Sequence, residues 1–136
     1  MRANRSMPPS TVIPVLAYPD VGEAVGWLCE VFGFAERWRA GNHRAQLWVG
    51  EGAIAVTGGG SGDAASSSTV MVRVDDVDAH HARAVERGAR ISGAPQDYPY
   101  GERQYTAEDP GGHAWTFSQT IDDVAPEDWG GTSRRL

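Results

Sequence analysis

The sequence predicts an α+β fold made of two tandem β-α-β-β-β modules. The same order of patterns occurs twice: a β-branched strand, an acidic helix cap (Asp20, then Asp76), a helix ended by glycine, and further strands. A glycine-containing turn also precedes the last strand of each half, at residues 50–52 and 109–112. A repeat of this kind indicates that one supersecondary unit occurs twice in the chain.

The first module begins with a β-branched, apolar strand at residues 11–18, in which Pro14 suits an edge position. Asp20 then caps a helix over residues 21–32, and Glu23 completes a capping box three residues later. Apolar residues recur along this helix at helical spacing, and a glycine follows it: Ala24, Trp27, Leu28, Val31 and Gly33. Three short strands with turns between them follow at residues 35–39, 44–49 and 53–57.

The second module repeats this order. A strand at residues 69–74 leads to Asp75 or Asp76, either of which caps a helix over residues 77–87. We expect that helix to carry three apolar residues inward and to end at a glycine: Ala79, Ala82, Val85 and Gly88. A short strand at residues 90–91 precedes a hairpin over residues 100–119. In the hairpin, strands at 103–108 and 113–119 flank the turn Asp109-Pro110-Gly111-Gly112, and one face carries Trp115 and Phe117.

These patterns divide the chain into five segments of one structural domain. They are an N-terminal arm (residues 1–10), the first module (11–57), a Gly/Ser-rich linker (58–68), the second module (69–119) and an acidic C-terminal tail (120–136). The composition of the linker predicts flexibility. In the tail, we expect Trp129 to anchor the chain to the domain.

Composition excludes several function classes. The 136-residue chain has a formal net charge of −6, and all 12 of its basic residues are arginines that form no run, which argues against nucleic-acid binding. An apolar run of about 20 residues and a secretory signal are both missing, so we expect no membrane association. The single Cys29 fits a reducing compartment, and we expect a cytoplasmic protein. Net acidity favours a neutral or cationic partner.

Two motifs and the tandem modules resemble the vicinal oxygen chelate superfamily, which contains glyoxalases, bleomycin resistance proteins and extradiol dioxygenases. The motifs are G-A-R-I at residues 88–91 and D-P-x-G-H-x-W at residues 109–115. Residues 74–79 and 100–103, with Asp109-Pro110, are similar to its PhnB-like branch. The resemblance covers residues 11–119. It implies curved sheets around a cleft, and a homodimer in which a second chain completes the cleft or docks edge to edge.

In metal-dependent members, the resemblance implies ligands on the first and last strands of each module, typically His, Gln or Glu. Carried over by position, these sites fall near Ile13 and Thr69 on the first strands, and at residues 54–56 and Thr116 on the last strands. None of these positions holds a good ligand for a divalent metal. We therefore expect neither a metal nor another cofactor, and we identify no catalytic residue.

Polar and aromatic residues on the predicted strands are the candidates for lining the cleft. Trp48 alternates with Leu47 and Val49, so it faces the same way as Gln46 and Arg44, which suits a cleft wall. Arg103, at the mouth of the second module, is equally suited to an ion pair with Glu108 or Asp109. The candidate ligand-binding residues are therefore Trp48, Gln46, Arg44, Tyr100, Glu102, Arg103 and Tyr105.

The histidines have structural interpretations. Adjacent His80 and His81 point about 100° apart on a helix, so they cannot chelate one ion together, and we expect both to face solvent. We expect His113 to bond the backbone of its turn, and His43 to stand alone in a turn. For Trp27 and Trp115 a core position is expected.

Three functions remain open at this point. The favoured one is metal-independent binding of a small cationic or aromatic molecule in the cleft, as the resemblance to bleomycin-type resistance proteins implies. The alternative is a divalent-metal-dependent glyoxalase- or dioxygenase-like enzyme with an atypical site. A regulatory or interaction module without a small ligand is the third.

Overall fold

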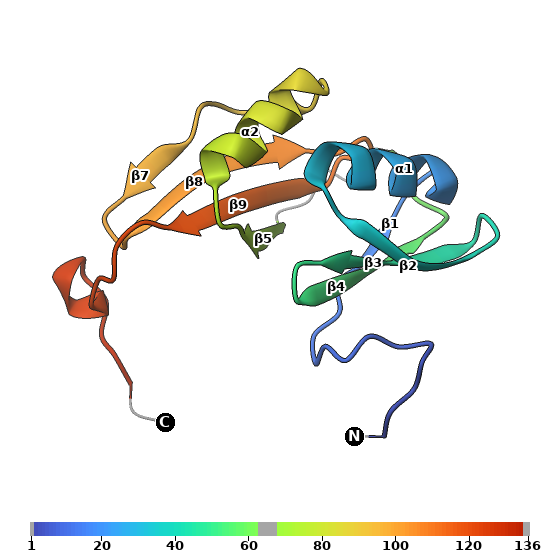
Figure 1. Ribbon diagram of the computed structural model, residues 1–136, viewed down its shortest axis with the longest axis horizontal. Helices are drawn as coiled ribbons and strands as arrows, with labels where there is room; N and C mark the ends of the chain where they lie inside the picture. The colour runs from blue at the N-terminus through green and yellow to red at the C-terminus, as the bar shows by residue number, and fades with distance from the viewer. Residues whose placement is uncertain (1, 63–67, 135–136) are drawn as a thin grey trace.

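The two halves of the chain form two sheets that lie side by side, each covered on the same side by one helix (Figure 1). The computed structural model describes residues 2–62 and 68–134. The first half contains β1 (Val15–Ala17), α1 (Val21–Phe32), β2 (Ala35–Ala40), β3 (Arg44–Val49) and β4 (Gly52–Thr57). The second contains β5 (Thr69–Arg73), α2 (Val77–Glu86), β6 (Arg90–Ile91), β7 (Gln96–Tyr98), β8 (Glu102–Glu108) and β9 (Ala114–Thr120), and the 3-10 helix η1 (Pro126–Asp128) follows in the tail.

In both sheets the first strand of the module pairs in parallel with its last strand. The strand order is β1-β4-β3-β2 in the first sheet and β5-β9-β8-β6 in the second, where β7 also pairs with β8. The pairs β1–β4 and β5–β9 are parallel, and the others are antiparallel. This equivalence confirms the predicted α+β fold of two tandem β-α-β-β-β modules. Strand β7 is an addition that the sequence analysis did not predict.

The helices begin where the sequence predicts. The side chain of Asp20 accepts a hydrogen bond from the Glu23 N–H, and that of Asp76 accepts one from the Ala79 N–H, both at 3.0 Å. Each carboxylate satisfies one of the free N–H groups at a helix N-terminus and complements the helix dipole. Gly33 has φ of 77°, the left-handed conformation that ends α1.

The first strand is shorter than predicted. It covers Val15–Ala17 rather than residues 11–18. Pro14 is the reason, because it has no N–H to donate to a neighbouring strand. Its carbonyl still accepts a hydrogen bond from the Ala55 N–H at 2.9 Å, so pairing with β4 begins there.

Helix α2 packs on a different face from the one expected. Ala79, Ala82 and Val85 are exposed, whereas Val77 and Ala84 are fully buried. The expectation that His80 faces solvent was also wrong, because its ring stacks on Phe117 with centroids 3.9 Å apart. Helix α2 therefore turns toward the sheet the face that carries Val77, His80 and Ala84, rather than the face that carries Ala79, Ala82 and Val85.

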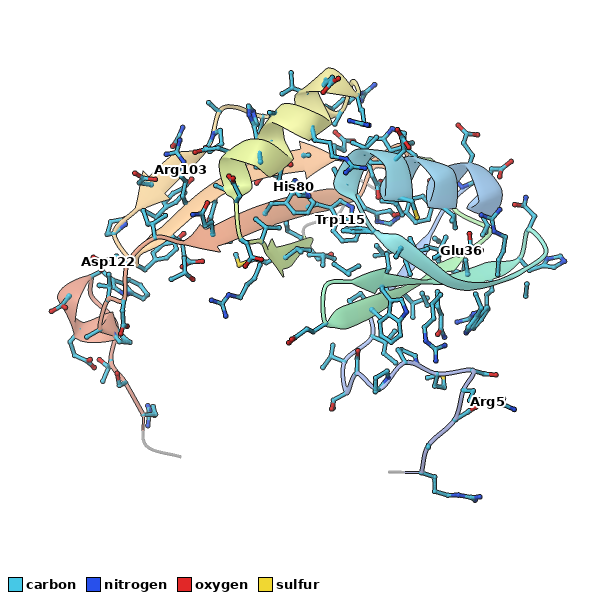
Figure 2. The ribbon with its side chains drawn as sticks, in the orientation of Figure 1. Arg5, Glu36, His80, Arg103, Trp115 and Asp122 are labelled. Carbon is cyan, nitrogen blue, oxygen red and sulfur yellow. The ribbon has the colours of Figure 1, made fainter. Side chains whose placement is uncertain are left out.

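A single hydrophobic core joins the two modules. Phe32 and Phe34, at the end of α1 and after it, lie 5.8 and 5.2 Å from the ring of Trp115 on β9. Figure 2 shows Trp115 where the two modules meet. The C-terminal end of α1 also depends on α2, since Arg83 donates two hydrogen bonds to the Glu30 carbonyl, at 3.0 and 2.9 Å. The expected core position of Trp115 is confirmed, and Trp27 packs partly buried against the core.

The turn between β8 and β9 clamps the modules together through Asp109, which is 4% exposed. Its carboxylate accepts hydrogen bonds from the Tyr18 hydroxyl, from the Trp115 indole at 2.9 Å, and from the N–H groups of Gly111 and His113 at 2.9 and 3.0 Å. Burial, followed by the Asp109 charge, raises the pKa of Tyr18 far above its ordinary value, so the phenol stays a donor. The predicted turn motif is therefore a buried polar junction.

The linker is described only at its ends. Gly60 donates its N–H to the Tyr18 carbonyl at 3.1 Å, and a Cβ there would lie 2.6 Å from backbone atoms of Ala17 and Tyr18, which only glycine permits. The predicted flexibility covers residues 58–68, of which residues 63–67 lie outside the described residues, and it stays a prediction. In the described part of the chain, no helix is long and apolar enough to cross a membrane.

Candidate functional site

The face of the second sheet that points away from α2 carries a line of polar side chains. Tyr105 and Phe117 contact His80 of α2, and because side chains alternate along a strand, Gln104 and Ser118 lie on the opposite face. The strand register extends this face to eight residues. We call it the second-sheet face: Met71, Arg73, Glu102, Gln104, Thr106, Thr116, Ser118 and Thr120.

A chain of hydrogen bonds runs across the second-sheet face and ends at a carboxylate. The Tyr100 hydroxyl donates to the Gln104 side-chain carbonyl at 3.3 Å, and the Gln104 amide donates to the Ser118 hydroxyl at 2.9 Å. That hydroxyl donates to the Glu102 carboxylate at 2.7 Å. One Glu102 oxygen is therefore held in place, and the half-buried carboxylate keeps acceptor capacity for a ligand.

An aromatic cluster lies beside this network. The rings of Tyr98 and Tyr100 stack with centroids 5.5 Å apart, and Trp129 of the tail lies 5.3 Å from Tyr100. This contact is the anchoring role expected for Trp129. Tyr98 and Trp129 remain 39% and 45% exposed, so they offer aromatic surface to a ligand.

A groove of about 780 Å³ lies where the two sheets meet. We call it the junction groove. Residues before β1, the turn between β3 and β4, and strand β5 form its walls, among them Val12, Pro14, Met71 and Val72. Its charged residues are Glu51, Arg73 and Asp75, so the acidic side chains outnumber the basic one. The volume lies in the range of small-molecule sites, about 300–1,000 Å³.

The corresponding face of the first sheet is covered by the chain itself. Gln46 is 5% exposed, and its amide donates to the Ser6 carbonyl at 3.1 Å. Trp48 is half-buried, with the Arg37 guanidinium 5.3 Å from its ring centroid. The structure thus brings Gln46 and Trp48 together on one face, as alternation predicts, and Arg44 stands exposed at the end of that strand.

The second-module candidates separate onto two faces. Glu102 and Tyr100 belong to the polar network described above. Arg103 lies on the helix side and pairs with Asp78 and Asp97 at 3.0 and 2.9 Å, rather than with Glu108 or Asp109. Tyr105 is 3% exposed in the core, where it contacts His80. Neither Arg103 nor Tyr105 therefore faces the groove side of the sheet.

Gln104, Ser118 and Arg73 are site residues that the sequence analysis missed. Because side chains alternate along a strand, Gln104 lies on the same face of β8 as Glu102. For the same reason, Ser118 lies on the same face of β9 as Thr116. That signal was available in the sequence. The contact between Arg73 and the Thr120 hydroxyl, at 3.0 Å, depends on the parallel pairing of β5 with β9 and has no local signal.

The strand positions implied for a metal do not suit one. Ile13 lies before β1, and Thr69 pairs with Ala114 rather than with Thr116. The register instead puts Val15 beside Ala55 in the first sheet and Met71 beside Thr116 in the second. Methyl, thioether and neutral hydroxyl groups form a poor donor set for a divalent ion such as Mn²⁺ or Zn²⁺. Across residues 2–62 and 68–134, no group of three or more His, Cys, Asp or Glu side chains is placed to hold a metal ion.

Among the described residues, none of the groups with a shifted pKa lines the junction groove. His80 contacts the Tyr105 hydroxyl through Nδ1 and the Phe32 carbonyl through Nε2 at 3.1 Å, and burial lowers its pKa. The ring of His113 contacts the Ala17 carbonyl of β1 at 2.8 Å rather than the backbone of its own turn, so the expected partner was wrong. Cys29 is half-buried, and burial raises its pKa, which disfavours the reactive thiolate.

The chain resembles proteins of known structure over most of its length. It is 36% identical to TioX from Micromonospora sp. ML1, covering 82% of this chain and 99% of that one, with a TM-score of 0.70. The bleomycin-binding protein from Streptomyces verticillus, solved with copper(II)-bleomycin, shares the fold at 21% identity, with 78% and 92% coverage and a TM-score of 0.63.

Curated relatives match over a shorter region. The uncharacterized protein Rv0887c of Mycobacterium tuberculosis is 38% identical over 56 residues, which are 41% of this chain and 33% of that protein. The match therefore spans about a third of the length of that relative. The family model described as Glyoxalase/Bleomycin resistance protein/Dioxygenase superfamily matches residues 11–117, whereas the PhnB-like branch stays a prediction. With most of its length matched, this chain belongs to the Glyoxalase/Bleomycin resistance protein/Dioxygenase superfamily.

Proposed function

We propose that this protein binds a small organic molecule in the junction groove and on the adjoining second-sheet face, without a metal ion. The observation that carries the proposal is the groove itself, about 780 Å³ in volume and bordered by the side chains of both modules. Nine of its sixteen lining residues are apolar and three are charged, a mixture that suits a ligand with both apolar and charged parts.

The charges in the groove, and the rings at the β7 edge of the second-sheet face, favour a cationic, aromatic ligand. Glu51 and Asp75 in the groove outnumber Arg73, and the nearby Glu102 adds a further carboxylate on the second-sheet face. Exposed Tyr98 and Trp129 add ring surface, and a cation over such a ring gains about 0.5–1 kcal/mol. The bleomycin-binding relative makes bleomycin a reasonable first ligand to test.

Metal independence is part of the proposal. The support is the lack of good metal ligands on the paired first and last strands of each module. Val15 lies beside Ala55 in the first sheet, and Met71 lies beside Thr116 in the second. Mn²⁺, Fe²⁺, Ni²⁺ and Zn²⁺ should therefore leave the melting temperature unchanged. Stoichiometric metal in purified protein, with stabilisation when it is added back, would move the assignment to the metal-dependent enzyme.

Calorimetric titration with metal-free bleomycin, copper(II)-bleomycin and a panel of cationic, neutral and anionic aromatic dyes tests the ligand class. We expect cationic members to bind and the Met71→Arg variant, which places a positive charge in the groove, to bind them at least about tenfold more weakly. Val85→Arg is the matched control, because Val85 is 53% exposed on α2 and Met71 is 61% exposed. Binding by none of the cationic compounds, or equal binding by both variants, contradicts the proposal.

A homodimer is the assembly we propose, in the cytoplasm. Val12, before the edge strand β1, is 78% exposed, and Val15, within that strand, is 55% exposed. These side chains leave apolar surface for a second copy of the chain. Light scattering should give twice the 14.6 kDa of one chain. Val15→Glu should shift the mass toward the monomer, and Val85→Glu should not. A monomeric parent protein at micromolar concentration argues against the dimer.

A further inference from the structure

The N-terminal arm lies against the first sheet on the side opposite α1 (Figure 1). Polar side chains of β2 and β3 hold it through its backbone. Arg37 donates to the carbonyls of Arg5 and Met7 at 2.9 and 3.1 Å. The carbonyl of Ser6 between them accepts from the Trp38 indole at 3.2 Å and from the Gln46 amide at 3.1 Å. Three consecutive main-chain carbonyls are thus bound by side chains of one sheet face.

The donors are held in place by one another. The Gln46 side-chain carbonyl accepts from Arg37 at 3.0 Å, while the Arg37 guanidinium lies 5.3 Å from the Trp48 ring centroid. Gln46 therefore uses its oxygen to orient Arg37 and its amide to bind Ser6. A guanidinium with its plane and donors fixed in this way loses little entropy when it binds carbonyl oxygens. Arg37 and Gln46 are therefore oriented toward the backbone carbonyls of residues 5–7.

The contacts depend on backbone rather than on the arm's own side chains. In Figure 2 the labelled Arg5 lies below the first sheet, and its carbonyl accepts from Arg37. Pro8 is the buried residue of the arm. Ser10 Oγ is buried with no hydrogen-bond partner among the described residues, a destabilising feature of the seated arm that another occupant need not share.

We propose that this face, formed by Arg37, Trp38, Gln46 and Trp48, is a binding site for peptide-like molecules that present consecutive amide carbonyls, and that residues 5–8 are an internal occupant that such a ligand displaces. The site is separate from the junction groove, and it recognises a different chemistry. A carbonyl-rich chain can replace every hydrogen bond described above between the arm and the sheet, because each of them goes to an arm main-chain carbonyl.

The test is binding of a fluorescent, end-blocked peptide with the sequence of residues 2–10, measured by anisotropy. Pro8→Asp places a charge at the buried position and should release the tethered arm without altering the sheet. Pro9→Asp is the matched control, because Pro9 is exposed. Pro8→Gly, which introduces no charge, is measured in parallel in case Pro8→Asp does not fold.

A short tether gives the arm an effective concentration of about 1 mM, so a face that holds it should bind the free peptide with a Kd at or below about that value. We expect the Pro8 variants to bind at least about tenfold more tightly than the parent protein and Pro9→Asp. Adding Arg37→Met removes two of the carbonyl contacts and should weaken binding by about tenfold.

Three results would overturn the proposal. The first is that a folded Pro8 variant binds no peptide at concentrations well above about 1 mM. The second is that the parent protein, the Pro8 variants and Pro9→Asp bind the peptide equally tightly. The third is that adding Arg37→Met leaves the binding unchanged. The junction-groove variant Met71→Arg should not affect peptide binding, which separates this site from the groove.

Discussion

The buried carboxylate of Asp109 offers the sharpest test of how the modules are held together. In Asp109→Asn the side-chain oxygen can still accept from the N–H groups of Gly111 and His113, which lie 2.9 and 3.0 Å from Oδ1 in the parent. The new amide then faces the Tyr18 hydroxyl and the Trp115 indole, both of which donate to Oδ2. The hydroxyl can rotate to accept, but the indole N–H cannot.

The expected loss follows from that geometry. A buried hydrogen bond to a charged group contributes about 1.5–3 kcal/mol, and an unsatisfied buried donor costs about 1–3 kcal/mol. Because these terms overlap, we expect the free energy of unfolding to fall by about 3 kcal/mol, with the melting temperature lower by about 10 °C. Urea denaturation followed by tryptophan fluorescence measures the change.

Two controls isolate the cause. Asp123→Asn removes the same charge at an exposed position and should change the free energy of unfolding by less than about 0.5 kcal/mol. Tyr18→Phe removes one donor to Asp109, so its effect and that of Asp109→Asn should not add in the double variant. A loss below about 1 kcal/mol for Asp109→Asn, or full additivity with Tyr18→Phe, would refute the reasoning.

Three further predictions concern packing against Tyr18, the helix propensity of α1 and the protonation of His80. Gly111→Ala puts a Cβ 2.6 Å from a Tyr18 ring carbon and should destabilise by about 1–3 kcal/mol, whereas Gly93→Ala, with no atom within 4 Å, should be nearly neutral in urea denaturation. Gly26→Ala, exposed inside α1 with no atom within 4 Å, should raise the free energy of unfolding by about 0.5–1 kcal/mol, and an unchanged melting temperature contradicts this. Because burial lowers the pKa of His80 from its ordinary 6.5, the unfolded chain takes up its proton first. Unfolding free energy should therefore fall as pH drops below about 6.5, until the folded pKa is passed, and His80→Gln should flatten that dependence; an unchanged slope counts against it.

Much of the fold could be predicted because its signals are local. Asp20 and Gly33 set the ends of α1 through contacts within a few residues, and the glycine turns set the hairpins. The orientation of α2 could not be predicted in this way, since the stacking of His80 on Phe117 joins residues far apart in the sequence. Strand β7 pairs with β8 although all three of its residues are exposed, so it carries no hydrophobic pattern.

The candidate site was only partly accessible from sequence. Alternation placed Gln46 with Trp48, and Glu102 proved to be part of the polar network. Alternation predicts that the neighbours Glu102 and Arg103 point to opposite faces, but it cannot say which of the two faces a helix covers, so both are candidates from sequence alone. The seat of the arm depends on contacts between residues 30 to 40 positions apart, such as Gln46 with Ser6, and such contacts leave no local pattern.

The pairing of Tyr18 with Asp109 has a consequence for the way the chain is made. The two residues are 91 positions apart. At ribosomal rates of about 5–20 residues per second, Tyr18 is synthesised roughly 5–20 s before its acceptor. During that interval Phe32 and Phe34 lack the Trp115 ring against which they pack. The nascent first module therefore waits with aromatic surface uncovered, a state that chaperones recognise, and the chain closes its core only when the last hairpin leaves the ribosome.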